Sequence, residues 1–123
     1  MPQPAPALPL TPLSHTILLA LADEDRHGYG IIKEVVRQTD GSVNPGTGTL
    51  YAALHRLMQE GLLAESPFQP GPDSDQRRKY YRLTEAGRRV ARAETVRLAR
   101  LVEVARDKNL LAEPGTADGI RPQ

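Results

Sequence analysis

A short amphipathic helix followed directly by a hairpin constrains the fold of this chain most strongly. The helix is expected over residues 47–60, and Gly61 follows it where helices commonly end in a left-handed turn. Residues 62–66 and 78–83 read as strands, and the prolines between them exclude a helix there. The helix has one apolar face, formed by Leu50, Leu54, Leu57 and Met58.

Two helices are expected before this segment. The first begins at Thr11, whose side chain can cap it, has Pro12 in its first turn and ends near Asp23. The second follows a turn at residues 25–28 and stops at residues 40–41, an Asp-Gly pair. Its apolar face consists of Ile31, Ile32, Val35 and Val36.

The last helix is long. Thr84 is placed to cap it, and the helical pattern continues to about Leu111. About 26 helical residues extend ~39 Å, which is longer than a core of this size can cover. We therefore expect the chain to form a homodimer through the apolar stripe of this helix. The expected interface residues are Leu18, Val90, Leu98, Leu101, Val102 and Ala105.

The order of these elements predicts a mainly α fold of the α+β winged-helix class. Residues 11–84 would form a three-helix winged helix-turn-helix domain with a two-stranded wing, and residues 85–111 a C-terminal dimerisation helix. Residues 1–10 and 112–123 combine proline and small or polar residues without periodicity. We expect both ends to be disordered tails.

Charge is segregated along the chain, although the formal net charge is only +1. Residues 76–93 hold seven basic side chains and one acid, giving +6, so the remainder sums to −5. Such a segment can attract a polyanion to one face of the protein. The alternative for Arg88, Arg89 and Arg92 is a solvated helix surface.

Enzymatic and membrane functions lack support in the sequence. The chain has no cysteine, and His15, His27 and His55 show no metal-ligand spacing. Neither a glycine-rich phosphate loop nor a nucleophile elbow is present, so we expect no catalysis, cofactor or metal. No stretch approaches the roughly 18 apolar residues of a spanning helix, and no export signal is visible. These features favour a cytoplasmic protein.

The start of the helix at residues 47–60 suits contact with DNA. When a helix N-terminus enters the major groove, hydroxyl, aromatic and basic side chains can reach phosphates and base edges. The expected contacts are Thr47, Thr49, Tyr51, His55 and Arg56. Two alternatives stay open, because Tyr51 could be an aromatic residue at the edge of the core and Thr47 could be a helix cap.

Basic residues stand where the loop returns to the second strand. Arg77, Arg78 and Lys79 are expected to contact DNA phosphates, although cations there can also protect a sheet edge from aggregation. Tyr81 is expected to pack inward and anchor the wing. Tyr29 and the amides beside it are placed to meet a phosphate at a helix N-terminus.

Several short motifs lie between about residues 12 and 111. They are His27-Gly28-Tyr29-Gly30, Gly48-Thr49-Leu50-Tyr51, Leu54-His55-Arg56-Leu57, Glu60-Gly61-Leu62 and the basic segment 77–87. Together they resemble the PadR family of bacterial transcriptional regulators. The resemblance implies a winged-helix DNA-binding domain and a C-terminal helix that makes a two-fold dimer, as in the compact branch of the family. It also implies repression that is usually relieved by a small molecule.

Two features depart from the family pattern. The chain has no tryptophan, so the aromatic-drug mode of some members is not carried over. The loop at residues 67–76 is rich in proline and acid, which leaves the depth of wing insertion open.

The sequence thus predicts a homodimeric, ligand-responsive repressor that binds a pseudo-palindromic operator in double-stranded DNA. Its effector is a small molecule of unspecified chemistry. The main alternative is a winged-helix module for protein or RNA contacts, and a small enzyme is a second rival.

Overall fold

The computed structural model describes residues 8–67 and 79–112. Within these residues the chain forms helices and short strands in the expected order, with one additional strand. The elements are α1 (Pro12–Ala20), β1 (Arg26–His27), α2 (Gly28–Thr39), α3 (Thr47–Gln59), β2 (Leu63–Glu65), β3 (Tyr80–Leu83) and α4 (Glu85–Asp107).

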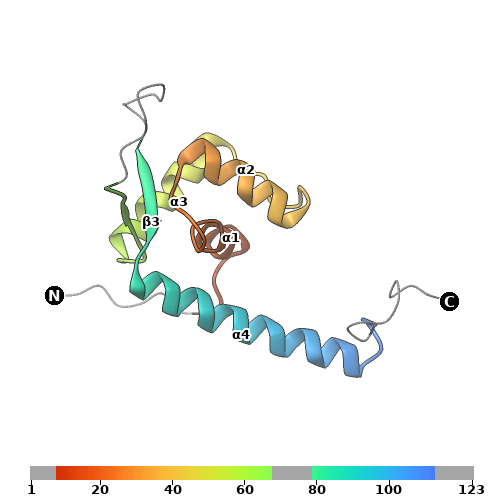
Figure 1. Ribbon diagram of the computed structural model, residues 1–123. Coiled ribbons are helices and arrows are strands. Elements are labelled where there is room, and N and C mark those ends of the chain that lie inside the picture. The colour runs from red at the N-terminus through yellow and green to blue at the C-terminus, as the bar shows by residue number, and fades with distance from the viewer. Residues whose placement is uncertain (1–7, 68–78, 113–123) are drawn as a thin grey trace.

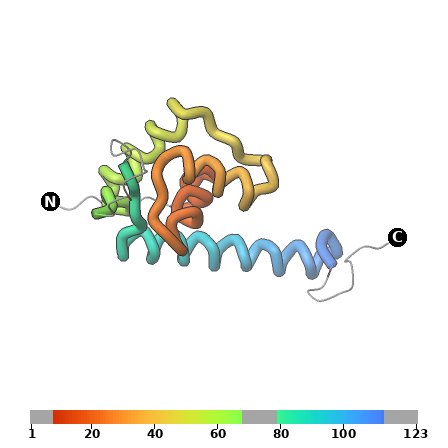
Figure 2. Tube along the Cα trace, turned by 45° about the horizontal axis from the view of Figure 1, so that its top comes forward, coloured from red at the N-terminus to blue at the C-terminus, as the bar shows by residue number. Residues whose placement is uncertain are grey.

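Helix α1 lies at the centre of the fold, between α2 on one side and α4 on the other (Figure 1). Helix α3 packs against both α1 and α2. Helix α4 runs along the side of the molecule that is opposite to α2, and it extends past the other elements (Figure 2). The core contains the completely or almost completely buried side chains of Ile17, Leu18, Ile31, Val35, Leu50, Leu54 and Leu57.

Side-chain caps fix the starts of α1 and α4, as the sequence predicts. The Thr11 hydroxyl accepts a hydrogen bond from the amide of Ser14, and the Thr84 hydroxyl accepts one from the amide of Gly87, each at 3.0 Å. The ends differ from expectation, because α1 stops at Ala20 and α4 stops at Asp107. Helix α4 is therefore 23 residues long and shorter than predicted.

Helix α3 differs from the prediction in its cap and in one core residue. Its cap is Gly46, which has no side chain to offer, and Thr47 is already helical. Met58 is 36 % exposed, whereas Ala53 is buried at 3 % exposure. At 100° per residue Ala53 lies closer than Met58 to the middle of the face made by Leu50, Leu54 and Leu57. The predicted left-handed glycine after this helix, Gly61, is confirmed by its φ of 78°.

The wing hairpin is confirmed, and it belongs to a three-stranded antiparallel sheet in the order β1-β3-β2. Strand β3 pairs with β2 through Leu83 opposite Leu63, and with β1 through Tyr80 opposite His27. Strand β1 lies where the sequence predicts a turn, because two residues are too short to show strand alternation.

Two residues lie where the sequence analysis did not expect them. Leu18, expected at a dimer interface, is 0 % exposed in the core of its own chain, so it has no surface to offer a partner. Leu10, expected in a disordered tail, packs against the core and donates its amide to Glu94. The remaining residues of the expected tails, 1–7 and 113–123, lie outside the described residues. Across the described part of the chain, no helix combines the length and apolar character needed to span a membrane.

Candidate nucleic-acid interface

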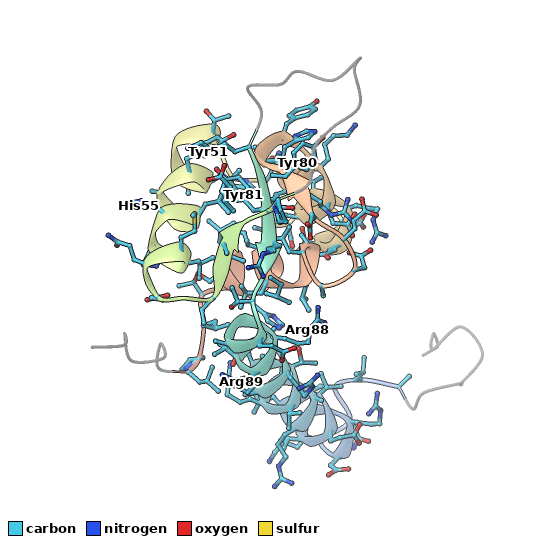
Figure 3. All side chains as sticks on the ribbon, turned by 60° about the vertical axis from the view of Figure 1, so that its left-hand side comes forward. Tyr51, His55, Tyr80, Tyr81, Arg88 and Arg89 are labelled. Atoms are coloured by element: carbon cyan, nitrogen blue, oxygen red, sulfur yellow. The ribbon has the colours of Figure 1, made fainter. Side chains whose placement is uncertain are left out.

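The polar side chains at the start of α3 are exposed, as a groove-reading helix requires. Thr47, Thr49 and His55 all lie on the surface, and Tyr51 is 48 % exposed. Figure 3 shows that His55 points away from the body of the molecule, whereas Tyr51 lies beside the wing strand and Tyr81. Helix α3 therefore presents hydroxyl, phenol and imidazole groups to solvent.

Tyr51 rests on the N-terminus of α2. A Cβ atom added at Gly28 would lie 2.2 Å from the Tyr51 hydroxyl oxygen and 2.7 Å from its Cζ, so only glycine leaves room for the ring. Both sequence interpretations of Tyr51 thus describe part of its position, because the ring packs at the edge of the fold while half of its surface is open. Burial raises the pKa of the neighbouring Tyr81, with smaller contributions from Tyr51 and Glu65. Tyr81 is 7 % exposed and packs inward as predicted.

His27 joins the wing to the start of α2. Its Nδ1 accepts a hydrogen bond from the amide of Gly30 at 3.2 Å and so caps the helix. Its ring also meets Tyr80 edge-on, with 5.2 Å between ring centroids and 87° between ring planes. Because His27 and Tyr80 are also paired in the sheet, β3 and the N-terminus of α2 are held in one unit.

Tyr29 is the most exposed aromatic residue of this region, at 61 %. The Lys33 ammonium lies 5.6 Å from the centroid of its ring, one helical turn along α2. Sequence reasoning missed Lys33, although its i+4 spacing from Tyr29 could have indicated the pair. Lys33 therefore adds a cation next to the expected phosphate contact of Tyr29.

Arg56 is directed toward the fold. Its guanidinium donates a hydrogen bond at 2.9 Å to the hydroxyl of Ser14, which is 3 % exposed at the start of α1. Arg56 is nevertheless an exposed residue, so this hydrogen bond ties part of its guanidinium to α1. Its contact with DNA stays a prediction.

The basic segment predicted from the sequence is divided in space. Lys79 is exposed at the base of the wing, and Arg77 and Arg78 lie outside the described residues. Figure 3 shows Arg88 and Arg89 at the start of α4, beyond the end of β3 and away from Tyr51. Arg88 donates a hydrogen bond to the carbonyl oxygen of Ala22 at 3.2 Å, so it helps to hold α4 against the domain.

The far half of α4 has an apolar face that nothing in the described chain covers. Val90 packs against the core, and Leu98 and Ala105 are partly buried further along the helix. On the same face Leu101 is 51 % exposed and Val102 is 42 % exposed. Apolar side chains at this helical spacing continue the core-facing stripe beyond the end of the core.

Comparison with known proteins assigns this architecture to a family. Residues 17–93 match the sequence model of the transcriptional regulator PadR-like family. The chain belongs to this family. Because PadR-like proteins are transcriptional regulators, the expectation that the chain is not an enzyme is confirmed. The PadR-like chain is also 34 % identical over 76 residues to Uncharacterized protein X of Lysinibacillus sphaericus, a match that covers 62 % of this chain and 68 % of the relative.

Solved PadR structures share the fold. A PadR family transcription regulator from Clostridium difficile is 28 % identical, with a TM-score of 0.64, over 77 % of this chain and 95 % of that protein. A transcriptional regulator from Clostridium thermocellum is 26 % identical, with a TM-score of 0.63, over 77 % and 87 %. Bacillus subtilis PadR in complex with operator DNA is 22 % identical, with a TM-score of 0.55, over 66 % and 46 %. The last likeness concerns the fold alone.

Proposed function

We propose that the protein is a cytoplasmic transcriptional repressor that binds a pseudo-palindromic operator as a homodimer. The observation that carries the proposal is that exposed side chains at the starts of two helices lie beside strand β3 of the wing. Thr47, Thr49 and Tyr51 come from the first turns of α3, and Tyr29 comes from the first turn of α2. Figure 1 shows these helix starts and the start of β3 on the side away from α4.

The chemistry of these groups fits duplex DNA. In helix-turn-helix proteins the N-terminal residues of the second helix contact base edges, while groups on flanking elements bind phosphates. Helix α3 would enter the major groove with Thr49 and Tyr51 leading. Lys79 and Lys33 would supply cations to the backbone on either side. The crystal structure of Bacillus subtilis PadR contains operator DNA, which supports DNA as the partner.

The exposed face of α4 supports a dimer. Leu101 and Val102 leave apolar surface in water at the end of a helix that projects from the domain. A two-fold axis near these residues would bury the face of each protomer against its copy and would place two α3 helices for two half-sites. Relief of repression by an effector rests on the family resemblance.

The test is selection of bound sequences from a random duplex pool, followed by sizing of the complex. We expect enrichment of an inverted repeat bound by two protomers. Tyr51→Ala should weaken binding to the selected operator about tenfold or more, because a good base or backbone contact is worth about 1–3 kcal/mol. Gln59→Ala, an exposed position at the other end of the same helix, is the control and should bind normally.

Three results would contradict the proposal. They are a pool without enriched sequences, binding of RNA in preference to duplex DNA, and normal operator binding by Tyr51→Ala. Preferential RNA binding would favour the alternative of a winged-helix module without sequence-specific DNA recognition.

A further inference from the structure

A charged side chain is buried where α4 crosses the start of α1. Glu94 is 1 % exposed, although it carries a carboxylate. The Arg97 guanidinium, one turn along α4, donates two hydrogen bonds to it at 2.7 and 2.9 Å. The amide of Leu10 donates a third at 3.2 Å from the segment that leads into α1. The carboxylate thus connects two parts of the chain that are 84 residues apart in sequence.

A second polar contact joins the same two elements. The Thr95 hydroxyl uses its proton for the carbonyl oxygen of Ala91, at 2.8 Å. Its oxygen lies 3.1 Å from Nε2 of His15 on α1, so His15 must donate this hydrogen bond. His15 is itself 9 % exposed. Glu94 and Thr95 together form a polar attachment of α4 to α1.

Helix α4 has another attachment at its first turn. The Thr84 hydroxyl donates to the carbonyl oxygen of Gly61 at 2.7 Å, and the Thr84 amide donates to that of Leu62 at 3.1 Å. A Cβ atom at Gly87 would lie 2.1 Å from the Leu62 oxygen, so the two backbones are in direct contact. One attachment would leave a pivot, whereas two attachments about 10 residues, or ~15 Å, apart fix the direction of the helix axis.

The direction of the α4 axis decides the position of the far half of this helix, which carries the exposed Leu101 and Val102. From Gly87 to Asp107 the helix rises about 30 Å. A rotation of about 10° around the first attachment would therefore move its far end by roughly 5 Å. The rise of duplex DNA is about 3.4 Å per base pair. In a two-fold dimer that meets at the far half, such a rotation would change the separation of the two α3 helices by more than one base pair.

We propose that Glu94 is a positioning residue that sets the half-site spacing read by the dimer, by fixing the angle between α4 and the DNA-reading domain. This inference rests on the proposed function. A buried ion pair is seldom the most stable solution, because apolar residues of similar volume often stabilise a fold equally well or better. It does impose a defined geometry, since its hydrogen bonds are directional. The Arg97 guanidinium lowers the pKa of Glu94 against the opposing effect of burial, so the carboxylate stays charged.

The chain offers a matched control for this residue. Glu94 and Glu103 both form i,i+3 ion pairs with arginines on α4, but the side-chain exposure is 2 % for Glu94 and 63 % for Glu103. Glu94→Gln and Glu103→Gln therefore remove the same charge from a buried attachment and from the surface. Arg97→Gln is a second test variant, and it alters a side chain that is 36 % exposed.

The first measurement is affinity for a set of operators whose half-site separation differs by single base pairs, with an isolated half-site for comparison. We expect the wild type to lose about tenfold in affinity when the separation changes by one base pair, and Glu94→Gln to lose less than about threefold. Affinity for the isolated half-site should be unchanged. Glu103→Gln should retain the wild-type preference.

The second measurement needs no DNA. Because the chain contains no cysteine, Gln59→Cys introduces one spin label per protomer on α3. The distance between the two labels of a dimer should be narrowly distributed in the wild type and in Glu103→Gln. It should broaden or shift in Glu94→Gln and in Arg97→Gln.

The inference is overturned if a folded, dimeric Glu94→Gln keeps the spacing preference and the narrow distance distribution. If Glu94→Gln does not fold, Arg97→Gln decides by the same criterion. A wild-type protein that binds no duplex DNA would instead overturn the proposed function. The two failures are therefore distinguishable.

Discussion

At the scale of single residues, Gly28 and Tyr51 constrain each other. The absence of a side chain at Gly28 lets the Tyr51 ring rest on the N-terminus of α2 with its hydroxyl at the surface. His27 and Tyr80 fix the same helix end to the wing. The position of the Tyr51 hydroxyl thus depends on the missing side chain at Gly28 and on the attachment of this helix end to the wing.

Gly28→Ala is expected to displace Tyr51 without unfolding the protein. The new methyl group would clash with the end of a half-exposed side chain, which can swing outward, so the free energy of unfolding should change by less than about 1 kcal/mol. Operator binding should fall as it does in Tyr51→Ala. Gly30→Ala is the control, because its nearest neighbour would be an ordinary contact at 3.6 Å. Titration of labelled operator and thermal unfolding measure the two effects, and wild-type affinity in Gly28→Ala would contradict the prediction.

His15 should make the stability of the fold depend on pH. Burial lowers the pKa of His15 from its ordinary value of 6.5, so the unfolded chain binds this proton more readily than the folded one. The contribution of neutral His15 to the free energy of unfolding is complete when the pH lies above the pKa of this group in the unfolded chain. It is lost as the pH falls through that value toward the lower pKa in the folded protein. The unfolding midpoint of the wild type should therefore drop between about pH 7.5 and 5.5.

His15→Gln should reduce this drop, because glutamine does not titrate. His55→Gln removes an exposed histidine from α3 and is the matched control. Calorimetry of the three proteins checks the prediction. An identical drop in His15→Gln would show that other groups cause it.

At the scale of elements, α4 has two different halves. Its first half is bonded to the domain through Thr84, Glu94 and Thr95, and its buried residues are part of the core. Its second half carries Leu101 and Val102 on an exposed continuation of the same face. The first half positions the helix, and the second half offers the surface for a partner.

Leu101→Asp combined with Val102→Asp is expected to give folded monomers. Burying such side chains is worth about 1.5–3 kcal/mol each, and a two-fold interface contains every residue twice. Both side chains are already exposed in the single chain, so the domain should stay folded. Sedimentation should show monomers, together with a loss of high-affinity binding to a two-half-site operator. Arg100→Asp introduces an acid on the opposite side of the helix as a control, and a double variant that remains dimeric would place the interface elsewhere.

At the scale of the whole molecule, charge is distributed over two regions with different tasks. Lys79 is exposed and directly precedes Tyr80, which pairs with His27 just before α2. Arg88 and Arg89 lie at the start of α4 (Figure 3). Arg88 is bonded to the carbonyl oxygen of Ala22. Among the described cations of the basic segment, Lys79 thus stands before β3, and Arg88 and Arg89 stand after it on α4.

Neutralising the wing cations should lower the salt dependence of DNA binding. Each phosphate contact that is lost should reduce the slope of log K against log salt by about 0.9. The test variant carries three substitutions, Arg77→Gln, Arg78→Gln and Lys79→Gln. Positions 77 and 78 lie outside the described residues. Arg89→Gln with Arg92→Gln, on α4, should leave the slope unchanged. A wing variant with the wild-type slope would show that these cations do not contact DNA.

The sequence by itself determined the order of the elements and most of their starts. Caps act locally, so Thr11 and Thr84 could be identified as helix starts and Gly61 as a helix end. The apolar spacing of α2 and α3 predicted the buried residues Ile31, Val35, Leu50, Leu54 and Leu57, whereas Ile32 and Val36 are only partly buried and Met58 is exposed. These features depend on residues within a few positions of one another, which is the range over which sequence patterns carry information.

Only the tertiary structure decided which of the candidate residues are free to bind. Leu18 was assigned to an interface but lies in the core, whereas Tyr51 and His55 on α3 are exposed. Strand β1 exists because β3 pairs with it, and Glu94 is buried because Leu10 and Arg97 satisfy its carboxylate. Each outcome depends on a partner far away in the sequence or on packing between helices, and neither leaves a periodic signal in the chain itself.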